Sequence, residues 1–207
     1  MASFRGVHGA MLSLESYLQR SLPAAWRQGQ GSINARVTLL GSRELAAQLS
    51  GNLLGLYLHR VTVDPYGRNR PLAPPPGPGA GGIHAELPVN LHFLVIANGT
   101  SAAIEADLLS WAMVALAEAP HLDLARVAEN DPDWGRREQA AITPSEMTDE
   151  DLLRLWDRFH AAYTLSVPYV MRTVRLRLAG EPLEGPDIAT RVLPVGRPET
   201  LPAEVTP

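Results

Sequence analysis

The stretch IHAELPVNLHFLVIA, residues 83–97, decides the fold of this chain. Its odd-numbered positions are all apolar, whereas its even-numbered positions are polar or proline until Leu94 and Ile96. Such a period of two is typical of a β-strand with one face on a core. The change at Leu94 and Ile96 predicts that both faces are covered there. Because Pro88 has no N–H to donate, we expect the secure strand over residues 89–97.

The segments around this strand predict three further strands and three sizeable helices. Apolar positions repeat at helical spacing in three segments, which begin near Val7, Ser101 and Thr148. Ser101 and Thr148 are placed to cap their helices. Alternation or continuous apolar sequence predicts strands over 33–39, 52–63 and 165–178. The region from His121 to Ile142 is less regular, and we expect no strand there.

This order of elements predicts the fold class. Two predicted strands follow one another before a helix returns, which is typical of α+β proteins. We therefore expect a mixed, mostly antiparallel sheet of about four strands with helices packed on one face. Residues 1–178 form the predicted domain, with a Pro/Gly-rich loop at 64–82 inside it. Residues 179–207 form a predicted Pro-rich C-terminal tail or arm.

Composition excludes several classes of function. The 207 residues have a net charge of −4, which gives no basic footprint for nucleic acid and no polybasic patch for a membrane. The chain has no cysteine, and all 18 of its basic residues are arginine, which excludes thiolate, Schiff-base and P-loop lysine chemistry. We find no signal peptide and no apolar run long enough for a transmembrane segment. These features favour assembly in the cytoplasm.

Motifs for catalysis are absent from the sequence. There is no H-E-x-x-H, no Walker A loop and no G-x-S-x-G elbow. The six histidines do not cluster in sequence, and Asp131-Pro132-Asp133 is best interpreted as a solvated turn. We expect no catalytic residue, no cofactor and no metal site. An enzyme or small-ligand protein that uses His92 and Asp131 stays as the remote alternative.

An ordered set of short segments resembles a known family. Leu87-Pro88-Val89-Asn90-Leu91-His92-Phe93-Leu94 looks like one of its hallmarks, after an opening Asn52-Leu53-Leu54-Gly55-Leu56-Tyr57. Leu152-Leu153-Arg154-Leu155-Trp156 and Leu165-Ser166-Val167-Pro168-Tyr169-Val170 resemble its closing helix and strand. With these gaps, roughly residues 7–178 resemble the cap, or tail-terminator, family of bacterial extracellular contractile injection systems, which are phage-tail-like particles.

The resemblance implies a structural role without catalysis. In that family six copies form a ring that closes the distal end of the inner tube and of the surrounding sheath. The implied partners are therefore further copies of this chain in a homohexamer, the sheath protein and the inner tube protein. The long loop at 71–82 and the tail after Leu178 depart from the family pattern. Another scaffold role in the same particle, such as tail completion or a baseplate adaptor, is the main alternative.

Arginines near the end of the last predicted strand are the candidate interface residues. Arg172, Arg175 and Arg177 suit a ring in which the subunits pair sheet to surface. An equally good interpretation is that these charges protect an exposed strand from aggregation. In the tail, the apolar island around Ile188 and Val192 is suited to add a strand to the sheet edge of a partner.

Overall fold

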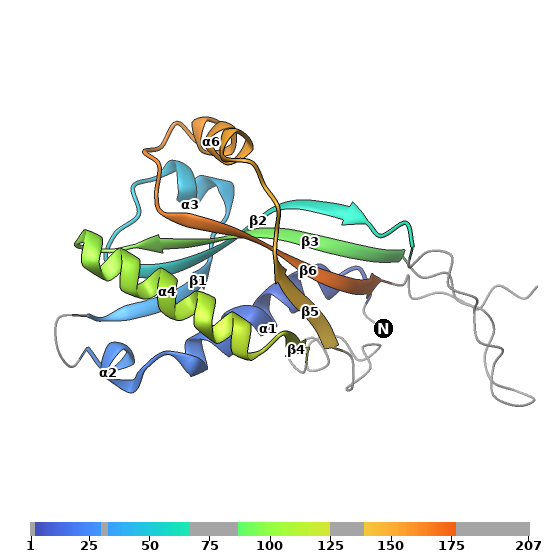
Figure 1. Ribbon diagram of the computed structural model, residues 1–207, viewed down its shortest axis with the longest axis horizontal. Coiled ribbons are helices and arrows are strands. Elements are labelled where there is room, and N and C mark those ends of the chain that lie inside the picture. The colour runs from blue at the N-terminus through green and yellow to red at the C-terminus, as the bar shows by residue number, and fades with distance from the viewer. Residues whose placement is uncertain (1–2, 30–32, 67–86, 125–138, 177–207) are drawn as a thin grey trace, which may run out of the picture.

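The computed structural model describes residues 3–29, 33–66, 87–124 and 139–176. Within these ranges one six-stranded sheet is flanked by five helices (Figure 1). The elements are α1 (Gly6–Ser21), α2 (Ala24–Arg27), β1 (Ala35–Leu39), α3 (Ser42–Ala46), β2 (Asn52–Val63), β3 (Leu87–Asn98), α4 (Ala102–Glu118), β4 (His121–Asp123), β5 (Gln139–Pro144), α6 (Asp149–Asp157) and β6 (Ser166–Leu176).

The sheet has the strand order β1-β2-β3-β6-β5-β4. β1 pairs with β2 in parallel, and every other neighbouring pair is antiparallel. The predicted α+β class with a mixed, mostly antiparallel sheet is confirmed. The strand predicted over residues 89–97 is β3, and its core-facing Leu91, Phe93 and Val95 are each 0% exposed.

Six strands replace the four that we predicted. The two additional strands are β4 and β5, and both lie in the region where we expected none. β4 has three residues, and β5 reads QAAITP, which is too short and too rich in alanine to show alternation. β5 is stabilised by pairing with its neighbours, because it forms antiparallel ladders with both β4 and β6.

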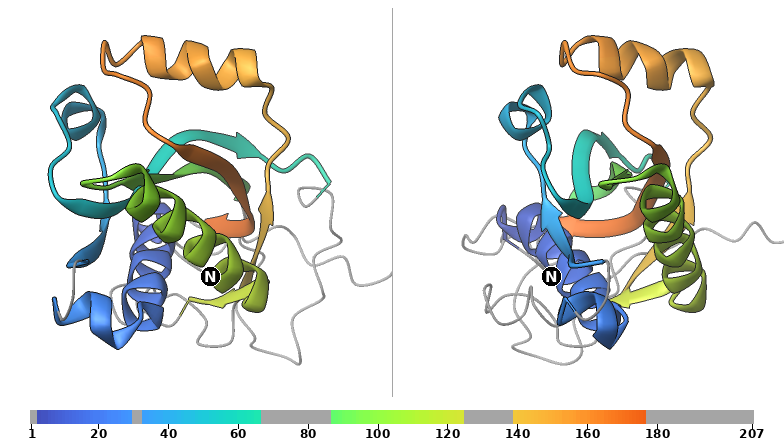
Figure 2. Two further views of the ribbon diagram at one scale, coloured as in Figure 1. Left: turned by 60° about the vertical axis from the view of Figure 1, so that its left-hand side comes forward. Right: turned by 90° about the vertical axis from the view of Figure 1, so that its left-hand side faces the viewer.

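The larger core lies between the sheet and the two long helices, α1 and α4, which cover the same face (Figure 2). From α1, Leu14 and Leu18 are 0% exposed, and from α4 so is Leu108. The hydroxyl of Tyr17 also donates to the carbonyl oxygen of Ala115 at 2.8 Å, which ties the two helices together. These contacts confirm the predicted helical faces.

Side chains of α1 also cover the outer edge of β1. The amide of Val37 donates to Oε1 of Gln19 at 2.7 Å, and the amide of Leu39 donates to Oε1 of Glu15 at 3.3 Å. A strand edge whose amides already have acceptors is a poor template for another strand. This edge of the sheet is therefore closed.

A smaller hydrophobic cluster lies on the opposite face of the sheet, beneath α3 and α6 (Figure 2). Leu94 and Ile96 of β3 contribute to it, as the loss of alternation at these positions predicted. Gly55 of β2 allows this packing, because a Cβ there would lie 2.3 Å from Cδ1 of Leu40. The predicted one-sided arrangement thus describes α1 and α4, while the short helices cover one end of the other face.

None of the helices in the described ranges combines the length and the apolar run that a membrane crossing requires. The loop predicted at 64–82 is described only as far as residue 66. The tail predicted from residue 179 lies outside the described residues.

Candidate functional site

Polar side chains gather on the face of the sheet that α1 and α4 leave open. Cross-strand partners share a face, and the register pairs Arg60 of β2 with His92 of β3. His92 in turn pairs with Val170 of β6, and Arg172 follows two residues further along β6. Arg60 and Arg172 therefore make this face basic around His92. The part of the same face near Leu94 and Ile96 is covered by α3 and α6.

An extra residue in β2 adds a second histidine to this face. The register between β2 and β3 shifts between Leu58 and Arg60, which leaves His59 as the bulged residue. The rings of His59 and His92 have their centroids 6.3 Å apart. His92 Nε2 lies 2.9 Å from Oγ1 of Thr62, whereas the buried Nε2 of His59 has no hydrogen-bond partner in the described part of the chain.

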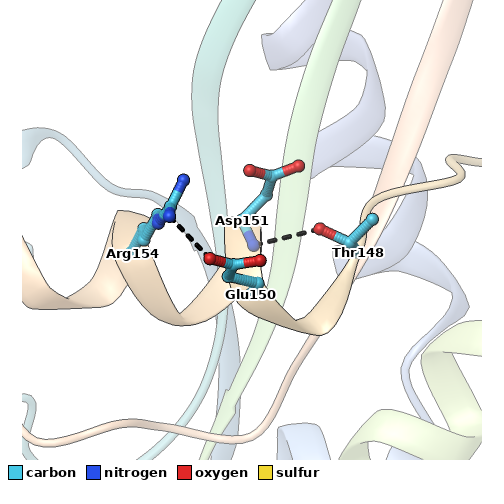
Figure 3. Close-up of polar contacts among 4 residues, drawn as sticks. All are labelled: Thr148, Glu150, Asp151 and Arg154. Atoms are coloured by element: carbon cyan, nitrogen blue, oxygen red, sulfur yellow. Dashed lines mark hydrogen bonds and ion pairs between the residues drawn. The ribbon is translucent and has the colours of Figure 1, made fainter.

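Helix α6 covers the histidines from above and is capped as its sequence predicted. The hydroxyl of Thr148 accepts a hydrogen bond from the amide of Asp151 at 3.1 Å, and Arg154 forms an ion pair with Glu150 (Figure 3). The indole N–H of Trp156 donates to Oγ of Ser166 at 3.1 Å in a buried contact. This hydrogen bond fixes α6 to the start of β6.

Ser166→Ala is expected to loosen α6. The substitution leaves the buried indole N–H of Trp156 without an acceptor, which should lower the free energy of unfolding by about 1–3 kcal/mol. Urea unfolding measures the loss, and amide exchange should show faster opening of α6. Thr164→Ala is the control, because the Thr164 hydroxyl reaches only the carbonyl of Ala162 at 3.5 Å. Equal stability of the two variants would contradict a fixing role for Ser166.

A pocket of about 400 Å³ lies between α6 and the open face. Its lining comprises His59, Arg60, His92, Ser145, Glu146, Met147, Asp151, Arg154, Leu155 and Arg158. Within the described ranges neither Arg60 nor Arg158 has an ion-pair partner. The guanidinium and imidazole groups of the pocket are suited to contact polar or anionic groups. The carboxylates of Glu146 and Asp151 reduce its positive charge.

The surroundings favour the neutral form of both histidines. Burial, with further contributions from the charges of His92 and Arg60, lowers the pKa of His59 to about 4. Burial, followed by the charges of Arg60 and Arg172, also lowers the pKa of His92. A neutral imidazole can donate one hydrogen bond and accept another.

The low pKa of His59 gives a pH dependence of stability with a definite sign. An unfolded histidine has a pKa of about 6.5, so the unfolded state binds the proton more tightly than the folded state. The contribution of His59 is therefore complete above pH 6.5 and is lost as the pH falls toward 4. As the pH falls from 6.5 to 4, the urea midpoint of unfolding should decrease less for His59→Gln than for the parent chain. His121→Gln on β4 controls for imidazole removal elsewhere, and an unchanged slope in His59→Gln would refute the assignment.

The structure brings together only part of what the sequence singled out. His59 and His92 are adjacent, a pairing that sequence spacing could not reveal because the two residues lie on different strands. Of the candidate interface residues, Arg172 is exposed on β6, and Arg175 pairs with Pro88 on the face opposite the buried Val174. The remaining candidates, Arg177, Ile188, Val192 and Asp131, lie outside the described residues.

The arrangement contains no evident metal centre. The described residues include no group of three or more His, Cys, Asp or Glu side chains placed to hold a metal ion. Trp111 packs edge-on against Trp26 with a centroid separation of 6.2 Å, and Trp156 is 3% exposed, so both have structural roles.

Comparison with known proteins assigns the chain to a family. The model of the Pvc16 N-terminal domain matches residues 11–190. The chain belongs to this family. The resemblance found in the sequence is thereby confirmed. No curated protein sequence matches this chain.

Solved structures that share the fold of this chain include two particle components. One is the sheath/tube terminator of the extracellular contractile injection system PVC, with a TM-score of 0.55 and 16% identity over 94% of this chain. The other is the tube-terminating cap of the anti-feeding prophage, with a TM-score of 0.53 and 16% identity over 91% of this chain. The chain spans 65% of the first protein and 60% of the second.

Proposed function

We propose that this chain is a structural cap, or tail terminator, of a contractile injection system. In this role six copies form a ring that closes the distal end of the inner tube and of the sheath. The partners are further copies of the chain, the sheath protein and the tube protein. The role needs no cofactor and no catalysis.

One observation supports this proposal most strongly. The family match covers residues 11–190, and the two similar structures described above are terminating proteins of such particles. The surface adds a second argument, because the described residues offer a pocket with several arginines on one sheet face. A protein that acts by contact needs such surfaces and no reaction chemistry.

Light scattering coupled to size exclusion tests the homohexamer. The purified chain is mixed with preassembled inner tube. We expect six copies of the chain to elute together with each tube end. The same mixture viewed by electron microscopy should show one ring at a tube end. A chain that stays monomeric and does not bind tube or sheath would overturn the proposal.

A further inference from the structure

One edge of β2 extends beyond the strand that pairs with it. β1 pairs only with residues 52–56 of β2, whereas β3 pairs with β2 as far as Val63. In Figure 1, β2 and β3 continue past the end of β1. Among the described residues, no strand therefore covers the outer edge of β2 from residue 57 to residue 63.

The register shows which backbone groups point outward from this edge. The amide of Asp64 donates to the carbonyl oxygen of Pro88 at 2.9 Å, so the amide of Asp64 faces β3. Successive residues of an antiparallel strand face the partner alternately, which turns the N–H and C=O groups of Val61 and Val63 away from β3. These outward groups have no hydrogen-bond partner in the described part of the chain. They form a template for one further strand.

Exposed apolar side chains lie beside the same edge. Val61 and Val63 are 46% and 45% exposed, and Leu87 of β3 is 42% exposed. The partners of the two valines on β3 are Leu91 and Val89. Leu87 lies two residues before Val89, so all three exposed side chains share one face of the sheet. A further strand with apolar side chains on this face would cover them.

The C-terminal tail contains a segment that suits this edge. Residues 188–193 read IATRVL and lie outside the described residues. Ile188, Thr190 and Val192 are β-branched and alternate, which is typical of a strand. Pro194 has no N–H to donate and would end such a strand.

The length of the tail before this segment allows it to reach the edge. Leu176, the last residue of β6, pairs with Leu87 at the end of the sheet where β2 also ends. From β6 to a position outside β2 is three strand spacings, or about 14 Å. A flexible chain of about 11 residues, the length of 177–187, has a root-mean-square end-to-end distance of roughly 18 Å. A segment that starts at this end and runs back along β2 is antiparallel to it.

We propose that residues 188–193 pair with residues 58–63 of β2 in the same chain and add an antiparallel strand to the sheet. A contact within one chain is favoured, because a linker that matches the distance gives an effective concentration on the order of millimolar. The added strand binds the outward N–H and C=O groups of Val61 and Val63. It also protects the subunit from pairing edge to edge with other copies. The inference does not depend on the proposed ring.

Cross-linking tests the contact, because the chain has no cysteine of its own. Val63→Cys and Ile188→Cys are combined in one full-length chain, which is treated with a short bismaleimide. We expect a cross-link within the monomer, identified by mass spectrometry of its tryptic peptides. Gln139→Cys combined with Ile188→Cys is the control. Gln139 is exposed on β5, the strand next to β6, so a freely moving tail would reach it as readily as Val63. The control should give at least tenfold less product.

Two chains with different tags separate a contact within one chain from a contact between copies. One chain carries only Val63→Cys and the other only Ile188→Cys, and the two are co-expressed before treatment. We expect no covalent dimer. A dimer with both tags would put the tail of one copy on the edge of another and overturn the proposal. Equal yields from the Val63→Cys chain and the Gln139→Cys control would also overturn it, because they would show collision without docking.

Amide exchange of the full-length chain gives a second measurement. Ala189→Pro with Thr190→Pro removes two adjacent N–H groups of the segment, so whichever of them faces β2 is lost. We expect the amides of Val61 and Val63 to exchange at least tenfold faster in this variant than in the parent chain. Ala203→Pro with Glu204→Pro, beyond the segment, should leave their exchange unchanged. Equal exchange in the parent chain and the variant at 189 and 190 would contradict the contact.

Discussion

Phe93→Ala is expected to lower the free energy of unfolding by about 3–5 kcal/mol, the usual cost of removing a buried phenylalanine ring. Phe93 is 0% exposed at the centre of β3, and its ring stacks on that of Tyr169 with centroids 5.9 Å apart. The free energy of unfolding of a domain of this kind is about 5–15 kcal/mol in total, so the variant should be close to unfolding at 37 °C.

Urea unfolding followed by circular dichroism measures this loss. Val114→Ala provides the matched control, because it removes apolar atoms from an exposed position on α4. It should change the stability by less than about 0.5 kcal/mol. A Phe93→Ala variant as stable as Val114→Ala would mean that β3 does not form the centre of the core.

Arg175→Glu combined with Arg177→Glu is expected to weaken ring assembly at least ~30-fold, which corresponds to one interface residue of the strongest class. Arg175 lies on β6, and the double reversal replaces two positive charges with two negative ones. The folded subunit should survive, because Val174 and the other core-facing positions of β6 are unchanged.

The concentration dependence of the ring, followed by light scattering, gives the result. Arg20→Glu with Arg27→Glu reverses the same number of charges at exposed positions of α1 and α2 and should leave assembly unchanged. Unchanged assembly in the Arg175 and Arg177 variant would remove both residues from the interface. It would favour the other interpretation of these arginines, in which they protect an exposed strand from aggregation.

Where the local pattern was strong, the sequence was enough to predict the fold. The alternation from Val89 to Ala97 located β3, and the caps at Ser101 and Thr148 located the starts of α4 and α6. In each case the physical determinant lies within a few residues of the element itself. For the same reason β4 and β5 were missed, since their stability comes from pairing with distant strands.

The candidate site depended still more on distant contacts. A bulge at His59 and the register of β2 on β3 bring His59 near His92, although 32 residues separate them in sequence. The pocket also requires α6 to fold back over the sheet, which depends on the buried contact of Trp156 with Ser166. No spacing rule within one segment predicts such a meeting. Alternation alone separates Arg175 of β6 from the buried Val174, and the place of Arg175 in an interface stays a prediction.

The position of the chain in an intact particle tests the proposed cap most directly. A small tag fused to the chain, labelled with gold and imaged by electron microscopy, would show where the protein is located. We expect label at the end of the tube and sheath distal to the baseplate, at one location in each particle. Label at the baseplate or along the sheath would contradict a terminating role and favour another scaffold role in the same particle.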